Sequence, residues 1–345
     1  MNKHGGDIYR NRNVTDFSSN CNPFGAPERV KKAIADSAEK IGNYPDTECT
    51  ELRKAISEYE GVPSEYIICG NGAADLIFAI ASGSRPSSAL VTAPAFSEYS
   101  QALMASGCSI KKYFLKEENG FKINEDILEY ITDNTDMMFL CNPNNPTGVV
   151  TENQLILKIL KKCREKGTVL VLDECFTDFL EHPGKHTMKG FLEEYDNLII
   201  LKAFTKKYAV AGLRLGYAMT GSSSLCEKIK ASMQPWGVSV PAQEAGIAAL
   251  KENEYAKKSM EYLSKEKVFL KESISKAGFK VYGSEANYIF FKGPVTLYDY
   301  CLERGILIRD CSNYDGLEKG YYRVAVRLHN DNVKLIDLLK GIEGR

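Results

Sequence analysis

The sequence has no long apolar run, no paired-cysteine motif and almost no net charge, and each absence excludes a class of protein. No apolar stretch in the 345 residues approaches the length that crosses a bilayer, and residues 1–13 lack the apolar core of a signal peptide. We therefore expect a cytoplasmic protein without a membrane span. The net charge of −1 provides no broad attraction to nucleic acid or to an anionic membrane. Any anionic substrate must then be held by local cations.

Ten cysteines are present, but they are scattered singly and no two of them form a C-x-x-C motif. Cys69 and Cys141 lie inside apolar runs, where a buried, reduced thiol is the natural interpretation. The chain has only four histidines, so a zinc site is not expected. These features favour a cytoplasmic protein that has a small-molecule site and no metal.

Short apolar runs alternate with helical patterns over residues 66–217. The runs Met137–Cys141, Val169–Leu172 and Asn197–Leu201 are continuously apolar, as in strands that are buried on both faces of a parallel sheet. The amphipathic segment Thr151–Lys166 separates two of these runs, as the helix of a crossover connection does. The sequence therefore predicts an α/β fold with a large, doubly wound, mostly parallel sheet.

The pattern changes after residue 217. One long helical segment is expected over residues 241–278, and short strands with Gly and Asp turns follow it up to a closing helix at residues 332–342. Residues 1–26 are rich in turn formers and indicate an irregular arm. We predict a large domain at residues 47–235 and a smaller α+β domain made from residues 1–46 and 236–345.

The stretch Ala203–Tyr217 combines a lysine after a buried strand with an arginine in a Gly-Leu-Arg-Leu-Gly turn. Desolvation lowers the pKa of a buried lysine, so that Lys206 could react with a carbonyl group. The planar guanidinium of Arg214 suits a phosphate, because it binds oxyanions through two donors. One cofactor, pyridoxal 5'-phosphate (PLP), carries both an aldehyde and a phosphate. The alternative is a surface loop with three solvated cations.

Other residues with useful chemistry follow the neighbouring predicted strands. Gly72 stands where a strand meets a helix, so the N–H groups after it form an anion site, although the third glycine of a dinucleotide-binding motif is absent. Phe96 follows the next strand and can stack on a flat heterocycle. Asn145 offers an amide in a rigid loop, and Asp173 can pair with a protonated ring nitrogen. Taken singly, these residues also suit a tight turn, a core phenylalanine or a helix cap.

All six groups follow predicted strands of the large domain. Because parallel strands end at the same edge of a sheet, the groups would meet at one ligand-binding edge. Chance could place one or two of them there. A lysine, an arginine, a carboxylate, an amide, an aromatic ring and a glycine turn in one layout favour the PLP site over the separate alternatives.

With these motifs the chain resembles the class I and II aminotransferases, PLP enzymes of fold type I, over nearly its whole length. The resemblance rests on NPNNPTG at 142–148, the pair Asp173-Glu174 and TKKYAVAGLRLGY at 205–217. It implies that Lys206 binds the cofactor covalently and that Asp173 partners the ring nitrogen. The other cofactor contacts that it implies are Gly72, Ala73, Ala74, Phe96, Asn145, Thr205 and Arg214. Tyr44 resembles a tyrosine that reaches the phosphate of a neighbouring subunit, which implies a homodimer.

Two branches of this family share most of these motifs. Histidinol-phosphate aminotransferases form one branch. However, HGG at 4–6, DFSSNCNPFG at 16–25, ILIRDCSNYDGL at 306–317 and YYRVAVR at 321–327 are more similar to the threonine-phosphate decarboxylases of cobalamin biosynthesis. The resemblance implies an enzyme that acts on a phosphorylated amino acid, by decarboxylation or, alternatively, by transamination with 2-oxoglutarate. A sensor with the same fold is the alternative outside enzymes, and the absence of a basic helix-turn-helix segment disfavours it.

Three arginines in the predicted small domain are candidate substrate ligands. Arg323 and Arg327 lie four residues apart on a predicted strand, so their side chains would share a face. With Arg309 they offer one guanidinium for a carboxylate and others for a phosphate. The alternative is a set of exposed arginines on edge strands. His4, Asn22 and Asn145 complete the predicted substrate set.

Two positions depart from the family pattern. Phe176 stands where many aminotransferases have a tyrosine that bonds the oxygen of the cofactor ring, so Asn145 would act alone there. Ala203 replaces a hydroxyl residue that often helps to hold the phosphate. Neither change removes an essential group.

Overall fold

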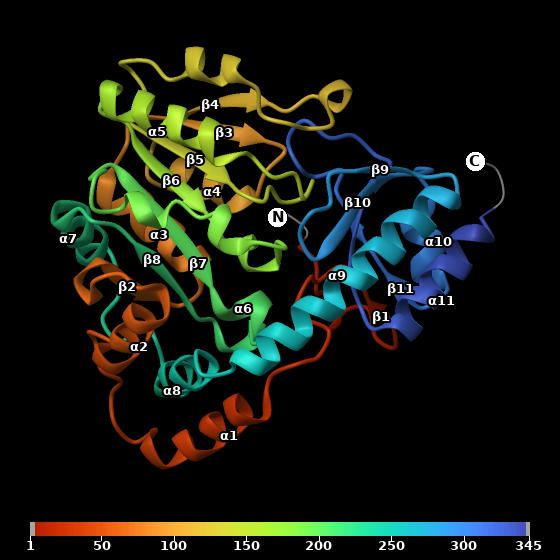
Figure 1. Cartoon of the computed structure of the whole chain (residues 1–345), viewed down its shortest axis with the longest axis horizontal. Coiled ribbons are helices and arrows are strands. Elements are labelled where there is room, and N and C mark those ends of the chain that lie inside the picture. Colours follow the sequence, from red (N-terminus) through yellow and green to blue (C-terminus); the bar gives the residue numbers. More distant parts are fainter. Residues whose placement is uncertain (1–3, 343–345) are drawn as a thin grey trace.

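A seven-stranded sheet forms the centre of the larger part of the protein in the computed structural model, which describes residues 4–342 (Figure 1). In spatial order the strands are β2 (Ile67–Gly70), β8 (Gly216–Met219), β7 (Leu198–Ala203), β6 (Val169–Asp173), β5 (Met137–Cys141), β3 (Ser88–Ala93) and β4 (Ser109–Phe114). β8 runs antiparallel to both of its neighbours, and all other pairs are parallel. The predicted α/β fold with a mostly parallel sheet is confirmed.

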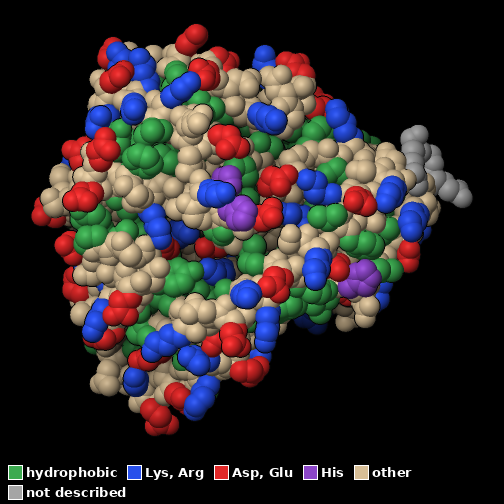
Figure 2. Space-filling model, viewed as in Figure 1, with side chains coloured by type: hydrophobic (Ala, Val, Ile, Leu, Met, Phe, Trp, Pro, Cys, Tyr) green, Lys and Arg blue, Asp and Glu red, His purple; other side chains and the backbone are tan. Residues whose placement is uncertain are grey.

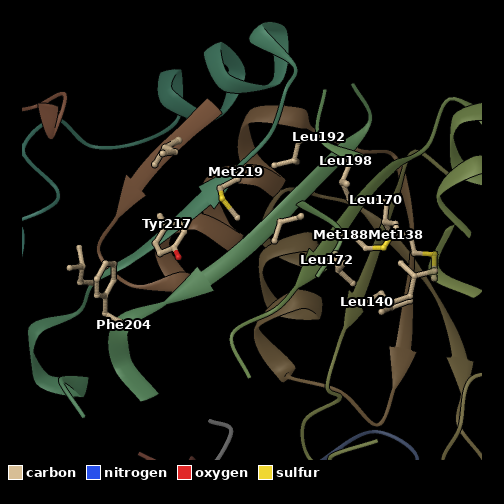
Figure 3. Packing of buried hydrophobic residues seen from close by; sticks show 14 of the residues in the cluster. Met138, Leu140, Leu170, Leu172, Met188, Leu192, Leu198, Phe204, Tyr217 and Met219 are labelled. Atoms are coloured by element: carbon tan, nitrogen blue, oxygen red, sulfur yellow. The ribbon is translucent and has the colours of Figure 1, made fainter. Parts of the chain in front are cut away.

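Helices cover both faces of this sheet, which explains why its central strands are apolar throughout. Alternate residues of β5 and β6, such as Leu140 and Leu172, pack toward helix α5 (Asn153–Lys166) and join the cluster in Figure 3. The residues between them, such as Phe139 and Val171, pack against α3 (Ala73–Ser84) and α4 (Ser97–Ala105). α7 (Ser223–Ala231) lies beside α3. Burial on both faces leaves only the strand ends open for ligands.

The smaller sheet is antiparallel, in the order β12 (Arg309–Asp310), β13 (Tyr321–Ala325), β10 (Tyr288–Lys292) and β9 (Lys280–Tyr282). Helices α9 (Asn253–Lys276), α10 (Leu297–Glu303) and α11 (His329–Lys340) cover one of its faces. The other face packs against the large domain through residues such as Phe290 and Tyr321. Within the N-terminal arm, β1 (Thr15–Asp16) pairs in parallel with β11 (Ile306–Leu307).

The single helix predicted over residues 241–278 is wrong, because a turn after residue 249 separates α8 (Val240–Ala249) from α9. α8 packs against α1 (Glu28–Asp36) and α2 (Thr50–Glu60). A Cβ atom at Gly246 would lie only 2.7 Å from side-chain atoms of Leu52 and Leu215, so glycine permits this close packing. α8, which lies beyond the predicted boundary at residue 235, therefore shares the core of the large domain.

The surface matches the near-neutral composition. Figure 2 shows Lys and Arg side chains interspersed with Asp and Glu over the face that it displays. Within residues 4–342, no helix is both long enough and apolar enough to cross a membrane.

Candidate active site

A cavity of about 290 Å³ lies at the carboxyl ends of the large-sheet strands, between the large domain, the small sheet and the N-terminal arm. This is the edge at which open α/β sheets bind ligands. The predicted site residues that line it are His4, Ala73, Ala74, Phe96, Asn145, Asp173, Thr205, Lys206, Arg214, Arg309 and Arg323. Residues more than 300 positions apart in the sequence thus meet in one cavity.

One end of the cavity has the properties of an anion site. Helix α3 begins at Ala73, and its first-turn N–H groups have no partner inside the helix. Gly72 precedes them with a φ of +86°, and a Cβ atom there would lie 2.6 Å from Nη2 of Arg214. Only glycine therefore allows the guanidinium to approach this backbone so closely. With Thr205, these groups form what we call the anion cradle: residues 72–74, Thr205 and Arg214.

Lys206 follows β7 in the short helix α6 (Phe204–Lys207), and its backbone is fixed by the N-terminal arm. The N–H of Asn22 donates to the Lys206 carbonyl at 2.9 Å, and Nδ2 of Asn22 donates to the Lys207 carbonyl at 3.0 Å. Burial lowers the pKa of Lys206, and the nearby charge of Arg323 lowers it further. The amine is therefore more nucleophilic at neutral pH than that of an exposed lysine.

Asp173 ends β6 beside Cys141 and Leu201 of the neighbouring strands, and it is only 5% exposed. Its Oδ1 accepts from the N–H of Cys175 at 2.9 Å, and its Oδ2 accepts from the hydroxyl of Tyr99 at 2.5 Å. These bonds hold the carboxylate in one orientation. Sequence reasoning missed Tyr99, although it lies three residues after Phe96 and so on the same side of α4.

Aromatic and amide groups also line the cavity. Phe96 immediately precedes α4, and its ring lies edge-on to Tyr99 at 5.7 Å. Phe176 also lines the cavity and packs edge-on against Tyr288 at 5.1 Å. Oδ1 of Asn145 accepts a hydrogen bond from Nη1 of Arg323, so the Asn145 amide connects the large domain to the small sheet.

Arg309 and Arg323 are opposite each other in the register of β12 and β13. They are 6% and 5% exposed, and within the described part of the chain neither has an acidic side chain in ion-pair contact. Nη2 of Arg323 donates to the Ser18 carbonyl at 2.9 Å, and Nη2 of Arg309 donates to Asn313 at 2.7 Å. Buried charges without a counter-ion are costly, so two guanidinium groups in a cavity indicate an anionic ligand.

The structure does not bring every predicted residue into the cavity. The prediction that Arg327 shares a strand face with Arg323 is wrong, because β13 ends at Ala325; Nε of Arg327 instead lies 4.0 Å from Asp331. The side chain of Asn22 is engaged with backbone groups, and it does not line the cavity. It therefore positions the lysine loop, whereas the prediction made it a substrate ligand.

Of the other two predicted residues, His4 lines the cavity and Tyr44 does not. Nε2 of His4 lies 3.3 Å from Oε1 of Glu98 at the cavity wall. Tyr44 is 79% exposed and packs on Trp236, with ring centroids 4.7 Å apart.

Asn20 lines the cavity and was missed by sequence reasoning, which chose Asn22 from the same DFSSNCNPFG segment. It is 2% exposed, and its Nδ2 has no hydrogen-bond partner among the described residues. Both asparagines suit a polar site, and only the path of the backbone separates their roles.

The arrangement can hold a flat aldehyde that carries a phosphate. The anion cradle would take the phosphate, Phe96 would cover the ring, and the Asp173 carboxylate would accept a hydrogen bond from the protonated ring nitrogen. Lys206 supplies a reactive amine, and the two buried arginines remain for a second, anionic molecule.

Comparison with known proteins agrees with this geometry. Residues 12–336 match the family model described as aminotransferase class I and II. The threonine-phosphate decarboxylase of Salmonella typhimurium is 35% identical to the chain, over 98% of this chain and 96% of that protein. The histidinol-phosphate aminotransferase of Methanosphaera stadtmanae is 30% identical, over 95% of this chain and 90% of that protein.

Solved structures extend the similarity to the fold. The histidinol-phosphate aminotransferase of Clostridium acetobutylicum superimposes with a TM-score of 0.88 at 31% identity, over 94% of this chain and 98% of that one. The chain therefore resembles both decarboxylating and transaminating relatives over nearly its full length.

Proposed function

The chain belongs to the aminotransferase class I and II family, and on this premise we propose that it is a PLP-dependent enzyme that decarboxylates L-threonine O-3-phosphate. The observation that carries the substrate assignment is the pair of buried guanidinium groups, Arg309 and Arg323, which no acidic side chain neutralises within residues 4–342. A phosphorylated amino acid brings two anions, a carboxylate and a phosphate, to this pair.

The residues of the cavity fit PLP. Lys206 would hold it covalently, the anion cradle would bind its phosphate, and Phe96 would lie against its ring. Asp173, held by Tyr99, would keep the ring nitrogen protonated. When bound, PLP supplies an electron sink for the pair of electrons that a broken bond leaves on Cα.

The outcome would depend on which group at Cα the arginines and Asn145 place in the reactive position. If they hold the carboxylate there, the Cα–carboxyl bond would break and CO2 would leave. Lys206 Nζ would supply the proton that replaces the carboxyl group on Cα, and the product would be (R)-1-amino-2-propanol O-2-phosphate. Oδ1 of Asn145 orients the Arg323 guanidinium, so the large domain takes part in placing the substrate carboxylate.

Transamination of histidinol phosphate is the second candidate, and the 30–31% identity to enzymes of that name supports it. Purified enzyme should be tested with threonine phosphate, and separately with histidinol phosphate plus 2-oxoglutarate. CO2 release from the first alone is the expected result. If histidinol phosphate and 2-oxoglutarate give glutamate while threonine phosphate gives no CO2, the protein is an aminotransferase and the proposed decarboxylase activity is wrong.

The exposed Tyr44 side chain supports a homodimer in which this residue reaches the cofactor phosphate of the partner. Light scattering after size exclusion should give twice the mass of the chain. A Tyr44→Phe variant should keep that mass and bind PLP several-fold more weakly, by roughly the 1 kcal/mol of one hydrogen bond. A monomeric wild-type protein contradicts the proposal.

A further inference from the structure

Glu117 joins the two domains at a distance from the cavity. It lies in the loop after β4, which reaches toward β9 in Figure 1, and its side chain is 30% exposed. The hydroxyls of Tyr282 and Tyr321 both donate to its carboxylate. Nζ of Lys280 lies 2.9 Å from Oε1, and Nζ of Lys292 lies 3.0 Å from Oε2. Four donors from three strands of the small sheet thus converge on one large-domain carboxylate.

The carboxylate is held in its charged form. The hydrogen bond from Tyr282 is the largest of several contacts that place the pKa of Glu117 well below its usual range. Phe121, four residues later, packs edge-on against the rings of Tyr282, Phe290 and Tyr321 at 5.2, 5.5 and 6.0 Å. The loop therefore makes a polar and an apolar contact with the same face of the sheet.

The register shows what this face carries. Tyr321, Lys292 and Lys280 are cross-strand neighbours, and we call them the clasp row. Two residues along β13, on the same face, Arg323 pairs with Arg309 on one side and with Phe290 on the other. The row that Glu117 holds is thus adjacent to the row that lines the cavity with arginines.

We propose that Glu117 is a positioning residue that sets substrate affinity by holding the clasp row, and through it Arg323 and Arg309, at a fixed distance from the large domain. The inference rests on the proposed role of these arginines in binding the substrate. Glu117 touches neither the cavity wall nor the cofactor residues. Its loss removes the polar contact between the loop and this sheet face and leaves only the packing of Phe121, while the anion cradle and Lys206 stay in place on the large domain.

The test compares Glu117→Ala and Glu117→Gln with the wild-type holoenzyme. Glu125→Gln is the matched control, because Glu125 forms an exposed ion pair with Lys158 at 2.5 Å inside the large domain. KM for threonine phosphate should rise about tenfold in the alanine variant and less in the glutamine variant, which keeps an acceptor oxygen. The affinity for PLP and kcat should stay within about twofold of the wild-type values, since Lys206 and the anion cradle lie away from Glu117. Amide exchange at residues 321–325 should accelerate.

An unchanged KM overturns the proposal, because Glu117 is then irrelevant to substrate binding. A parallel loss of substrate affinity, kcat and PLP affinity also overturns it, because Glu117 then supports the fold in general. If the wild-type enzyme does not use threonine phosphate, the proposed function fails separately. In that case inorganic phosphate is used in place of the substrate, and its affinity is measured from the change in absorption of the bound cofactor. An unchanged phosphate affinity in Glu117→Ala then contradicts the positioning role.

Discussion

The cavity has two halves that are built in different ways. The cofactor half consists of loops that directly follow large-sheet strands, and its groups hold one another, as Tyr99 holds Asp173. The substrate half consists of Arg309 and Arg323 on the small sheet, which are held by backbone carbonyls and amides and have no acidic partner within residues 4–342. The first half is complete without a substrate, while the second still has two positive charges to neutralise. In the proposed function, the cofactor residues thus lie on the large domain and the two substrate arginines on the small sheet, with Asn145 connecting them.

Replacing Lys206 should have the largest effect, because it removes the reactive amine of the cofactor half. Lys206→Ala should lower turnover by at least about 10⁴-fold and abolish the visible absorption of covalently held PLP. Lys207→Ala is the control, since Lys207 contacts Tyr59 and Asp178 and points away from the cavity. If Lys207→Ala loses the absorption and Lys206→Ala keeps it, the two lysines have been assigned the wrong way round.

Arg323→Gln should break the substrate half and leave the cofactor half intact. Removing a buried guanidinium that pairs with a substrate anion costs about 2–5 kcal/mol, so kcat/KM should fall by roughly 30-fold to several thousand-fold, mainly through KM. Absorption spectra should show normal PLP binding. Arg327→Gln should change kcat/KM by less than about threefold, because Arg327 lies beside Asp331 outside the cavity. Equal losses in both variants contradict the separation of the two arginines.

Tyr99→Phe should weaken the cofactor half without removing it. The phenol donates to Asp173 at 2.5 Å, and a hydrogen bond to a charged group contributes about 1.5–3 kcal/mol, so kcat should fall about tenfold. Tyr322→Phe also removes a phenol hydrogen bond, to the neutral Pro294 carbonyl at 2.8 Å, on the far face of the small sheet. The Tyr322→Phe control should leave kcat unchanged. If its kcat falls as much as that of Tyr99→Phe, the effect of Tyr99 arises from lost stability and not from its bond to Asp173.

Replacing Glu174, which lies beside Asp173, should have the smallest effect on activity and should change only the stability of the fold. Burial raises its pKa to about 7 from an ordinary value of 4.5. The contribution of Glu174 to the free energy of unfolding is therefore fully present below about pH 4.5. It is lost as the pH rises through 7, by up to about 3 kcal/mol. Glu174→Gln keeps the acceptor for the Met188 N–H and does not ionise. Its Tm should exceed that of the wild type at pH 8 more than at pH 5, and the same difference at both pH values refutes the raised pKa.

The two halves also differ in how well the sequence predicts them. Asp173 ends one apolar strand and Lys206 follows the next, and the common edge of parallel strands then brings them together without further information. The substrate half depends on where strands end and how they pair. β13 stops before Arg327, and this one boundary decides which arginines enter the cavity.

Irregular backbone explains the remaining differences. Asn20 and Asn22 have the same chemistry two residues apart, and only the path of the arm over α6 turns one toward the cavity and the other toward the lysine loop. Glu117 lies in a loop whose partners are about 165 to 204 residues away, a contact that no local pattern indicates. The places of Asn20 and Glu117 relative to the cavity therefore depend on tertiary contacts, which the local sequence does not indicate.

The most direct test of the proposed reaction follows the carboxyl carbon of the substrate. Holoenzyme is incubated with L-threonine O-3-phosphate labelled at C1, with no 2-oxoglutarate present. A decarboxylase releases the label as CO2, in equal amount to the amino-propanol phosphate formed, and this is the result we expect. Label that stays in the organic product, or turnover that requires 2-oxoglutarate, contradicts the proposed decarboxylation and makes the protein an aminotransferase.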